Sequence, residues 1–106
     1  MAMGGFGNMQ QLMQRAKKMQ EELQEKQKEL EETIVTGSVA GGMVEIDMLG
    51  NKSIESIRIK PEAVDPDDIE MLEDLIKSAF NDASKQVDEL KEELFGGMNM
   101  PQGMGF

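Results

Sequence analysis

Between residues 43 and 60, apolar and polar side chains alternate with the two-residue period of a β-hairpin that buries one face. The apolar positions of its two strands are Val44, Ile46 and Met48, followed by Ile54, Ile57 and Ile59. Ile54 is out of phase with the other two residues of its strand. A one-residue β-bulge near Glu55 and Ser56 returns Ile54 to the apolar face, and we predict such a bulge there. Pro61 has no amide hydrogen for the ladder, so it ends the hairpin.

A third strand precedes the hairpin. Residues 33–40 are rich in β-branched side chains, and the glycine pair 41–42 follows them as a turn. Gly37, inside this strand, indicates either a bulge or a close approach by another part of the backbone. We predict that Gly50 and Asn51 form the hairpin turn, because both tolerate the positive φ that a tight turn requires. Short turns between consecutive strands predict a three-stranded antiparallel meander.

Helical patterns flank this sheet in the sequence. Residues 8–32 place apolar side chains at steps of three and four, close to a heptad seam, with Asn8 as a suitable N-cap. This helix spans about 37 Å, more than a small sheet covers, so part of it should project or pack on another subunit. The second helix starts at Asp65, which can cap it, with Pro66 at its first position. Its apolar stripe includes Phe80, which we expect in the core. The sequence therefore predicts an α+β fold of order α-β-β-β-α, in which two long helices flank a three-stranded antiparallel sheet.

The chain has 106 residues, enough for one domain, which we place at residues 8–95. We predict that residues 1–7 are a flexible N-terminus and that residues 96–106 are a disordered Met- and Gly-rich tail. There is no cysteine, no apolar run of the roughly 20 residues that a membrane helix needs, and no signal-peptide pattern at the N-terminus. We therefore expect a cytoplasmic protein without a membrane partner.

The reactive side chains do not form a catalytic constellation. The sequence contains no histidine, so no serine has a histidine base, and the carboxylates fall on helix and strand faces predicted to be solvated. Asp65, Asp67 and Asp68 could bind a divalent metal, but they lack the glycine and the distal glutamate of a calcium loop, and helix capping and the helix dipole explain them. We expect no enzyme activity, no cofactor, no metal and no small-molecule substrate.

The net charge of −10 is unevenly distributed along the chain. Residues 1–20 contain three cations and no acid, and the first acidic residue is Glu21. On a helical wheel these cations lie away from the apolar seam, beside three glutamines. Cations and amides can both hold phosphate oxygens, so this basic strip is a candidate DNA-binding surface, although an ordinary solvated helix face is the alternative interpretation. The basic strip consists of Arg15, Lys17, Lys18, Gln10, Gln11 and Gln14.

Several segments together resemble the YbaB/EbfC family of bacterial nucleoid-associated proteins. The resemblance covers roughly residues 9–101, and it depends on the Met/Gln/Lys-rich first helix and on residues 41–46, 50–51, 54–61, 72–83 and 98–101. It implies a tweezer-like homodimer that binds double-stranded DNA with little sequence preference and alters its conformation. It also implies a place in the nucleoid, with roles in nucleoid organisation, gene regulation and DNA protection.

A homodimer also follows from the residues themselves. A three-stranded sheet has edges that pair readily with another chain, and the two helices present more apolar surface than one small sheet can cover. A function of another class stays open at this point, namely a prefoldin-like interaction or chaperone module whose Met-rich surface binds unfolded proteins. Salt-sensitive binding to DNA would support the first function, and suppression of client aggregation the second.

Overall fold

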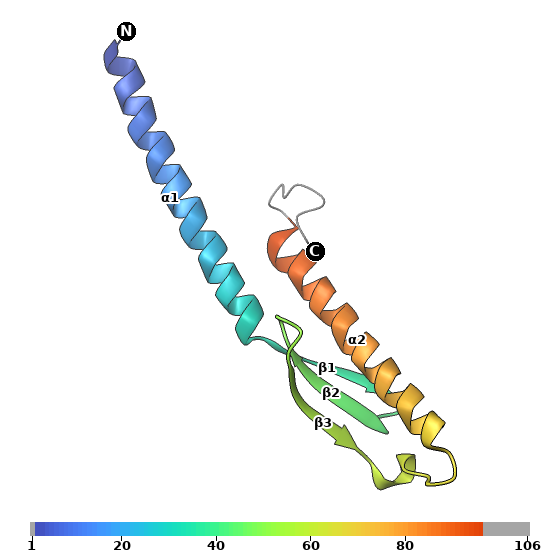
Figure 1. Cartoon of the computed structure of the whole chain (residues 1–106). Helices are drawn as coiled ribbons and strands as arrows, with labels where there is room; N and C mark the ends of the chain where they lie inside the picture. Colours follow the sequence, from blue (N-terminus) through green and yellow to red (C-terminus); the bar gives the residue numbers. More distant parts are fainter. Residues whose placement is uncertain (1, 97–106) are drawn as a thin grey trace.

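The computed structural model describes residues 2–96 and confirms the α+β fold of order α-β-β-β-α (Figure 1). A long helix, α1, leads into a three-stranded sheet, and a second long helix, α2, returns across one face of that sheet. A short 3-10 helix, η1, which the sequence pattern does not predict, connects the sheet to α2. The elements are α1 Ala2–Glu32, β1 Ile34–Val39, β2 Val44–Leu49, β3 Ile54–Ile59, η1 Pro61–Ala63 and α2 Ile69–Phe95. The predicted tail, from residue 97 onward, lies outside the described residues.

β2 is the central strand, and it pairs antiparallel with both of its neighbours, as the predicted meander requires. At the middle of the sheet, Ile46 of β2 lies between Gly37 of β1 and Ile57 of β3. The predicted bulge is confirmed, because Glu55 has no partner on β2. The pairs on either side of it are Asp47 with Ser56 and Met48 with Ile54. The three isoleucines of β3 therefore share one face of the sheet.

The turn between β2 and β3 differs from the prediction. The positive φ, 68°, falls on Lys52 and not on Gly50 or Asn51. The Lys52 amide donates to the Leu49 carbonyl at 2.8 Å, which gives a three-residue hairpin loop whose last residue is left-handed. Gly50 is required for space instead. A Cβ at Gly50 would overlap the carbonyl oxygen of Leu30, near the end of α1.

The start of α2 also differs from the prediction. Asp68, not Asp65, is its N-cap, and the Asp68 carboxylate accepts a hydrogen bond from the Met71 amide at 3.1 Å. The Asp65 carboxylate accepts from the Asp67 amide at 2.9 Å, within the loop before the helix. Pro66 belongs to the same loop rather than to the first turn of α2. The acidic cluster is thus accounted for by local backbone hydrogen bonds.

α2 packs on the inner face of the sheet, and the contact at Gly37 brings the two backbones together. A Cβ at Gly37 would overlap the carbonyl oxygen of Ala79, and Ala83 lies beside it. This confirms the second of the two alternatives for Gly37, a close backbone approach. The β2 residues beneath the helix are fully buried, namely Val44, Ile46 and Met48. Phe80 was expected in this core, but it is 37% exposed, because the alanines and not Phe80 face the sheet at Gly37.

α1 projects away from the rest of the molecule (Figure 1). It begins at Ala2 rather than at Asn8, so Asn8 lies inside the helix and does not cap it. Between Asn8 and the end of α1, Leu30 is the only buried residue, and it packs against Gly50 in the hairpin turn. The prediction that part of this helix extends beyond the sheet is confirmed.

Candidate nucleic-acid interface

The basic strip lies on the projecting part of α1, where all six of its side chains are exposed. Within residues 2–96, none of its cations forms an ion pair or a hydrogen bond with another side chain. Glu21 lies one helical turn from both Lys17 and Lys18, and Glu22 one turn from Lys18, but neither acid forms an ion pair with these lysines. The three positive charges of Arg15, Lys17 and Lys18 are therefore available to an anionic ligand.

The structure brings four members of the basic strip together in one shallow surface depression. These four are Gln11, Gln14, Arg15 and Lys18. They follow one another at steps of three, one and three residues, which places them on one side of the helix. Gln10 and Lys17 lie on the neighbouring side, since each residue turns the helix by about 100°. The strip therefore covers a broad face of α1 rather than a single line of side chains.

Two cations of the hairpin, Lys52 and Arg58, are in contrast already paired with acids, whereas Lys60 at the end of the hairpin forms no ion pair within residues 2–96. Lys52 lies 3.0 Å from the Asp88 carboxylate of α2. Arg58 contacts Asp47 at 2.6 Å and Glu45 at 3.4 Å. A phosphate would have to displace these carboxylates, so the paired cations are weaker candidates for binding DNA than the basic strip.

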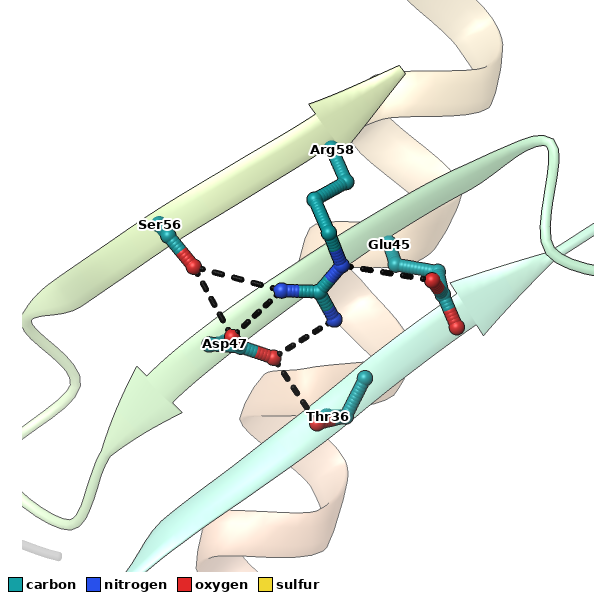
Figure 2. Close-up of polar contacts among 5 residues, drawn as sticks. All are labelled: Thr36, Glu45, Asp47, Ser56 and Arg58. Carbon is teal, nitrogen blue, oxygen red and sulfur yellow. Dashed lines mark hydrogen bonds and ion pairs between the residues drawn. The ribbon is translucent and has the colours of Figure 1, made fainter. Parts of the chain in front are cut away.

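Arg58 belongs to a polar cluster on the outer face of the sheet, the face that α2 leaves open (Figure 2). Two nitrogens of the Arg58 guanidinium donate to the two carboxylate oxygens of Asp47, at 2.6 and 3.0 Å. The hydroxyls of Thr36 and Ser56 each donate to the same carboxylate at 2.8 Å. Asp47 of the central strand thereby joins all three strands. The bidentate geometry favours the ionised form of both partners.

This geometry shifts the pKa values of both charged groups. The hydrogen bond from Arg58, followed by those from Ser56 and Thr36, holds the pKa of Asp47 far below its usual range. The hydrogen bond to Asp47 raises the pKa of Arg58 above its already high value. The cluster is thus a fixed ion pair that ties the strands together. Periodicity alone does not reveal this cluster, although Asp47 and Arg58 alternate with apolar residues on neighbouring strands.

The described residues offer neither a metal site nor a membrane-spanning helix. Between residues 2 and 96, no group of three or more His, Cys, Asp or Glu side chains is arranged to hold a metal ion. No helix in that range is long and apolar enough to cross a bilayer. The basic strip on α1 stays a candidate surface for a large anionic ligand.

The molecule is a small α+β body with a projecting helix, and the cations of that helix are unpaired within the described residues. A protein of this class is suited to contact a polyanion. The particular family follows from comparison with known proteins. The model of the YbaB/EbfC DNA-binding family matches residues 4–104, nearly the whole chain. The chain belongs to this family.

Relatives of similar length carry names that agree with the family. A nucleoid-associated protein of Clostridium acetobutylicum is 46% identical, and the match covers 95% of this chain and 98% of the relative. A nucleoid-associated protein of Xanthomonas campestris is 49% identical over 92% of this chain and 94% of its own. The crystal structure of an uncharacterised protein from Helicobacter pylori has a TM-score of 0.69 at 26% identity, covering 82% of this chain and 91% of that one. The names point to a nucleoid-associated DNA-binding protein and not to an enzyme.

Proposed function

We propose that this protein binds double-stranded DNA as a homodimer, with little sequence preference, and alters the conformation of the DNA in the nucleoid. The observation that carries the proposal is the basic strip, which is exposed and contains no acidic residue. It is located on α1, which projects as an arm from the body formed by the sheet and α2 (Figure 1). Arg15, Lys17 and Lys18 would contact phosphates by charge, and the glutamines would donate hydrogen bonds to phosphate oxygens. Nucleoid organisation, gene regulation and DNA protection would be consequences of such binding.

The net negative charge of the chain opposes DNA binding, but the position of the basic strip on the projecting helix α1 reduces this effect. Two copies together carry about −20, twice the −10 of one chain, so long-range attraction to DNA is absent. Arg15, however, lies about 22 Å along α1 from the anchor at Leu30, whereas screening at physiological salt acts over about 8 Å. A phosphate at the basic strip would therefore experience the nearby cations more strongly than the distant body.

A homodimer would supply two such arms. One arm offers three cations to one side of a duplex, and a second arm related by symmetry would allow a clamp on the backbone. Uncovered apolar side chains support the dimer, because large exposed apolar patches mark surfaces at which proteins associate. The large exposed apolar residues include Met9, Leu12, Met13 and Met19 on α1 and Ile54, Ile57, Ile59, Ile69 and Phe80 elsewhere.

Low specificity follows from the proposed mode of contact. If the basic strip binds phosphates rather than base edges, its contacts carry no direct information about sequence. We therefore expect similar affinity for unrelated duplexes and a strong dependence on salt.

The test replaces Arg15, Lys17 and Lys18 together by alanine. The control replaces Lys28, Lys77 and Lys85, three exposed lysines outside the basic strip, which changes the net charge equally. Both variants and the wild type are titrated against two unrelated duplexes at several salt concentrations, with the oligomeric mass checked. The salt-dependence slope of the first variant should fall by about 0.9 for each phosphate that it no longer binds. Equal affinities and slopes for the two variants would place the DNA site elsewhere.

The exposed methionines of α1 favour a second candidate, the prefoldin-like chaperone. Met9, Met13 and Met19 would bind apolar segments of unfolded proteins, as flexible thioethers adapt to varied partners. The continuous three-stranded sheet and the family weigh against this function. Suppression of client aggregation by the wild type, abolished when these methionines are replaced by serine, would support it.

A further inference from the structure

β1 is an edge strand whose sequence is suited to pairing with another chain. The strand order β1-β2-β3 leaves one side of β1 without a neighbouring strand. Its residues, Ile34–Val39, are mostly β-branched and include neither a charged residue nor a proline, whereas β2 and β3 both contain charged residues. Uncharged segments of high β-propensity pair readily with copies of themselves when they lie on an exposed edge. The outer edge of β1 is therefore a place where a further strand could be added.

Two side chains of α2 reach over this edge and bind its backbone groups. The Asp82 carboxylate accepts from the Ser38 amide at 2.9 Å, and the Gln86 side-chain amide donates to the Thr36 carbonyl at 2.7 Å. The Gln86 amide also donates to the Asp82 carboxylate at 3.2 Å. Both hydrogen bonds to Asp82 end on the same oxygen, Oδ2. These two linked side chains form the Asp82–Gln86 clasp.

The clasp lies over the middle of β1. The two backbone groups that it binds belong to Thr36 and Ser38, on either side of Gly37, where α2 and β1 approach most closely. The two clasp residues are one helical turn apart, which places both on the flank of α2 that faces the edge. A strand added to this edge would need the Ser38 amide and the Thr36 carbonyl for its own ladder. The clasp therefore occupies the groups that such a strand would use.

We propose that the Asp82–Gln86 clasp prevents the outer edge of β1 from pairing with β1 of a second copy of this chain. Pairing would first have to break the three hydrogen bonds of the clasp, and the new ladder would then only replace bonds that the edge already has. The sequence names the partner strand, because two copies of β1 bring no like charges together when they pair. Proteins commonly cover an exposed sheet edge in order to avoid such association.

The clasp would also limit the size of the proposed homodimer. Each copy has one β1 edge, so a dimer would have two. If both edges were open, dimers would join into a chain that does not close, because every added dimer would bring another open edge. A clasp on each edge would keep the protein in small units whose α1 arms remain free for DNA.

The test replaces Asp82 and Gln86 together by alanine and measures mass by light scattering over a range of concentrations. The concentration at which this variant forms larger assemblies should be about tenfold lower than for the wild type, because pairing supplies the hydrogen bonds that the edge has lost. The matched control replaces Asn81 and Glu89 by alanine. These two residues are exposed on the same helix and also provide one amide and one carboxylate, so this variant should keep the wild-type mass. Circular dichroism checks the fold of every variant.

Two further variants separate the hydrogen bonds from charge and from loss of stability. Asp82→Asn removes the negative charge but keeps one oxygen, which is enough to accept from both the Ser38 amide and the Gln86 amide, so this variant should keep the wild-type mass. Ser38→Lys, added to the double alanine variant, places a charge on the exposed β1 strand. It should reverse the assembly, because a charged edge strand opposes pairing.

Each result either supports or overturns the proposal. A double alanine variant that keeps the wild-type mass at every concentration would show that the clasp does not block the edge. Equal assembly of the Asn81 and Glu89 control would attribute the effect to general loss of polar surface, and equal assembly of Asp82→Asn would attribute it to charge. Assembly that Ser38→Lys does not reverse would place the pairing away from β1. The mass of the wild type tests the homodimer separately, and no DNA is used, so neither failure would be mistaken for failure of the clasp.

Discussion

The two long helices are similar in length but differ in what they do. α1 has 31 residues and α2 has 27. α2 buries Ala79, Ala83 and Val87 against the sheet, whereas α1, from Asn8 onward, buries only Leu30. α2 is therefore part of the core of the body, and α1 is an arm with one anchor. The stability of this fold and its proposed DNA-binding surface thus reside on different helices.

Composition explains the contrast. α2 places small side chains where it meets β1, so the two backbones approach closely and exclude water. α1 is rich in Gln, Glu, Lys and Met, which form helix well, and the apolar side chains of its outer half, such as Leu12 and Met19, have no cover within this chain. Its acids begin at Glu21, so the part near the body is acidic and the outer part is basic.

The largest effect on stability is expected from a substitution at the contact between α2 and the sheet. In Gly37→Ala the new Cβ would overlap the Ala79 carbonyl, which is backbone and cannot rotate away, so unfolding should require about 3 kcal/mol less free energy. Urea denaturation followed by circular dichroism measures the loss. Gly41→Ala is the control: its Cβ would meet nothing, and the strain at φ +68° should cost only about 1 kcal/mol. Equal losses for the two variants would mean that close packing of α2 does not dominate stability.

The part of the fold that depends on local pattern could be predicted from the sequence. The alternation of residues 43–60 gave the hairpin, and the phase error of Ile54 gave the bulge that leaves Glu55 unpaired. Boundaries set by competing local hydrogen bonds could not be predicted. Asp65 and Asp68 are both suitable N-cap residues, because aspartate is a preferred residue type there. Only the path of the loop after η1 determines that Asp68 is the N-cap.

The candidate site was predictable in part for the same reason. The basic strip is local to one helix, so its six residues could be placed on an exposed face from spacing alone. The shift of Phe80 out of the core and the joining of Asp47 to Arg58 depend on how separate elements pack. Periodicity indicates which face of a helix is apolar, but not how far the helix is displaced across the sheet.

A smaller effect is expected at the anchor of α1. Leu30→Ala removes the one side chain of α1 that is buried between Asn8 and Glu32. We expect unfolding to require about 2 kcal/mol less free energy, at the low end for a buried leucine because the site is near a helix end. The body should stay folded, since α2 and the sheet are untouched. DNA affinity should fall about tenfold, because an arm without a fixed direction must be ordered on binding.

Leu23→Ala is the control for the anchor. Leu23 is half-buried on the same face of α1, and its truncation should change DNA affinity by less than about twofold. Gel-shift titration and urea denaturation of both variants give the two quantities. If Leu30→Ala binds DNA with the affinity of the wild type, α1 does not need a fixed direction. The proposed role of Leu30 as the anchor of a DNA-binding arm would then be wrong.

The smallest effect on stability is expected from a substitution of Asp47, a sheet residue that neither helix covers. Asp47→Asn removes the charge that Arg58, Thr36 and Ser56 hold on the outer face of the sheet. The pKa of Asp47 is lower in the folded than in the unfolded protein, so its stabilising contribution is complete above about pH 4, the usual range of an unfolded aspartate, and is lost as the pH falls below that value. The difference between the urea midpoints of wild type and variant should therefore be largest at neutral pH and should shrink steadily as the pH falls below about 4. Glu55→Gln, which changes an exposed acid at the bulge, should give no such pH dependence. A difference for Asp47→Asn that is independent of pH would mean that ionisation of Asp47 does not stabilise the sheet.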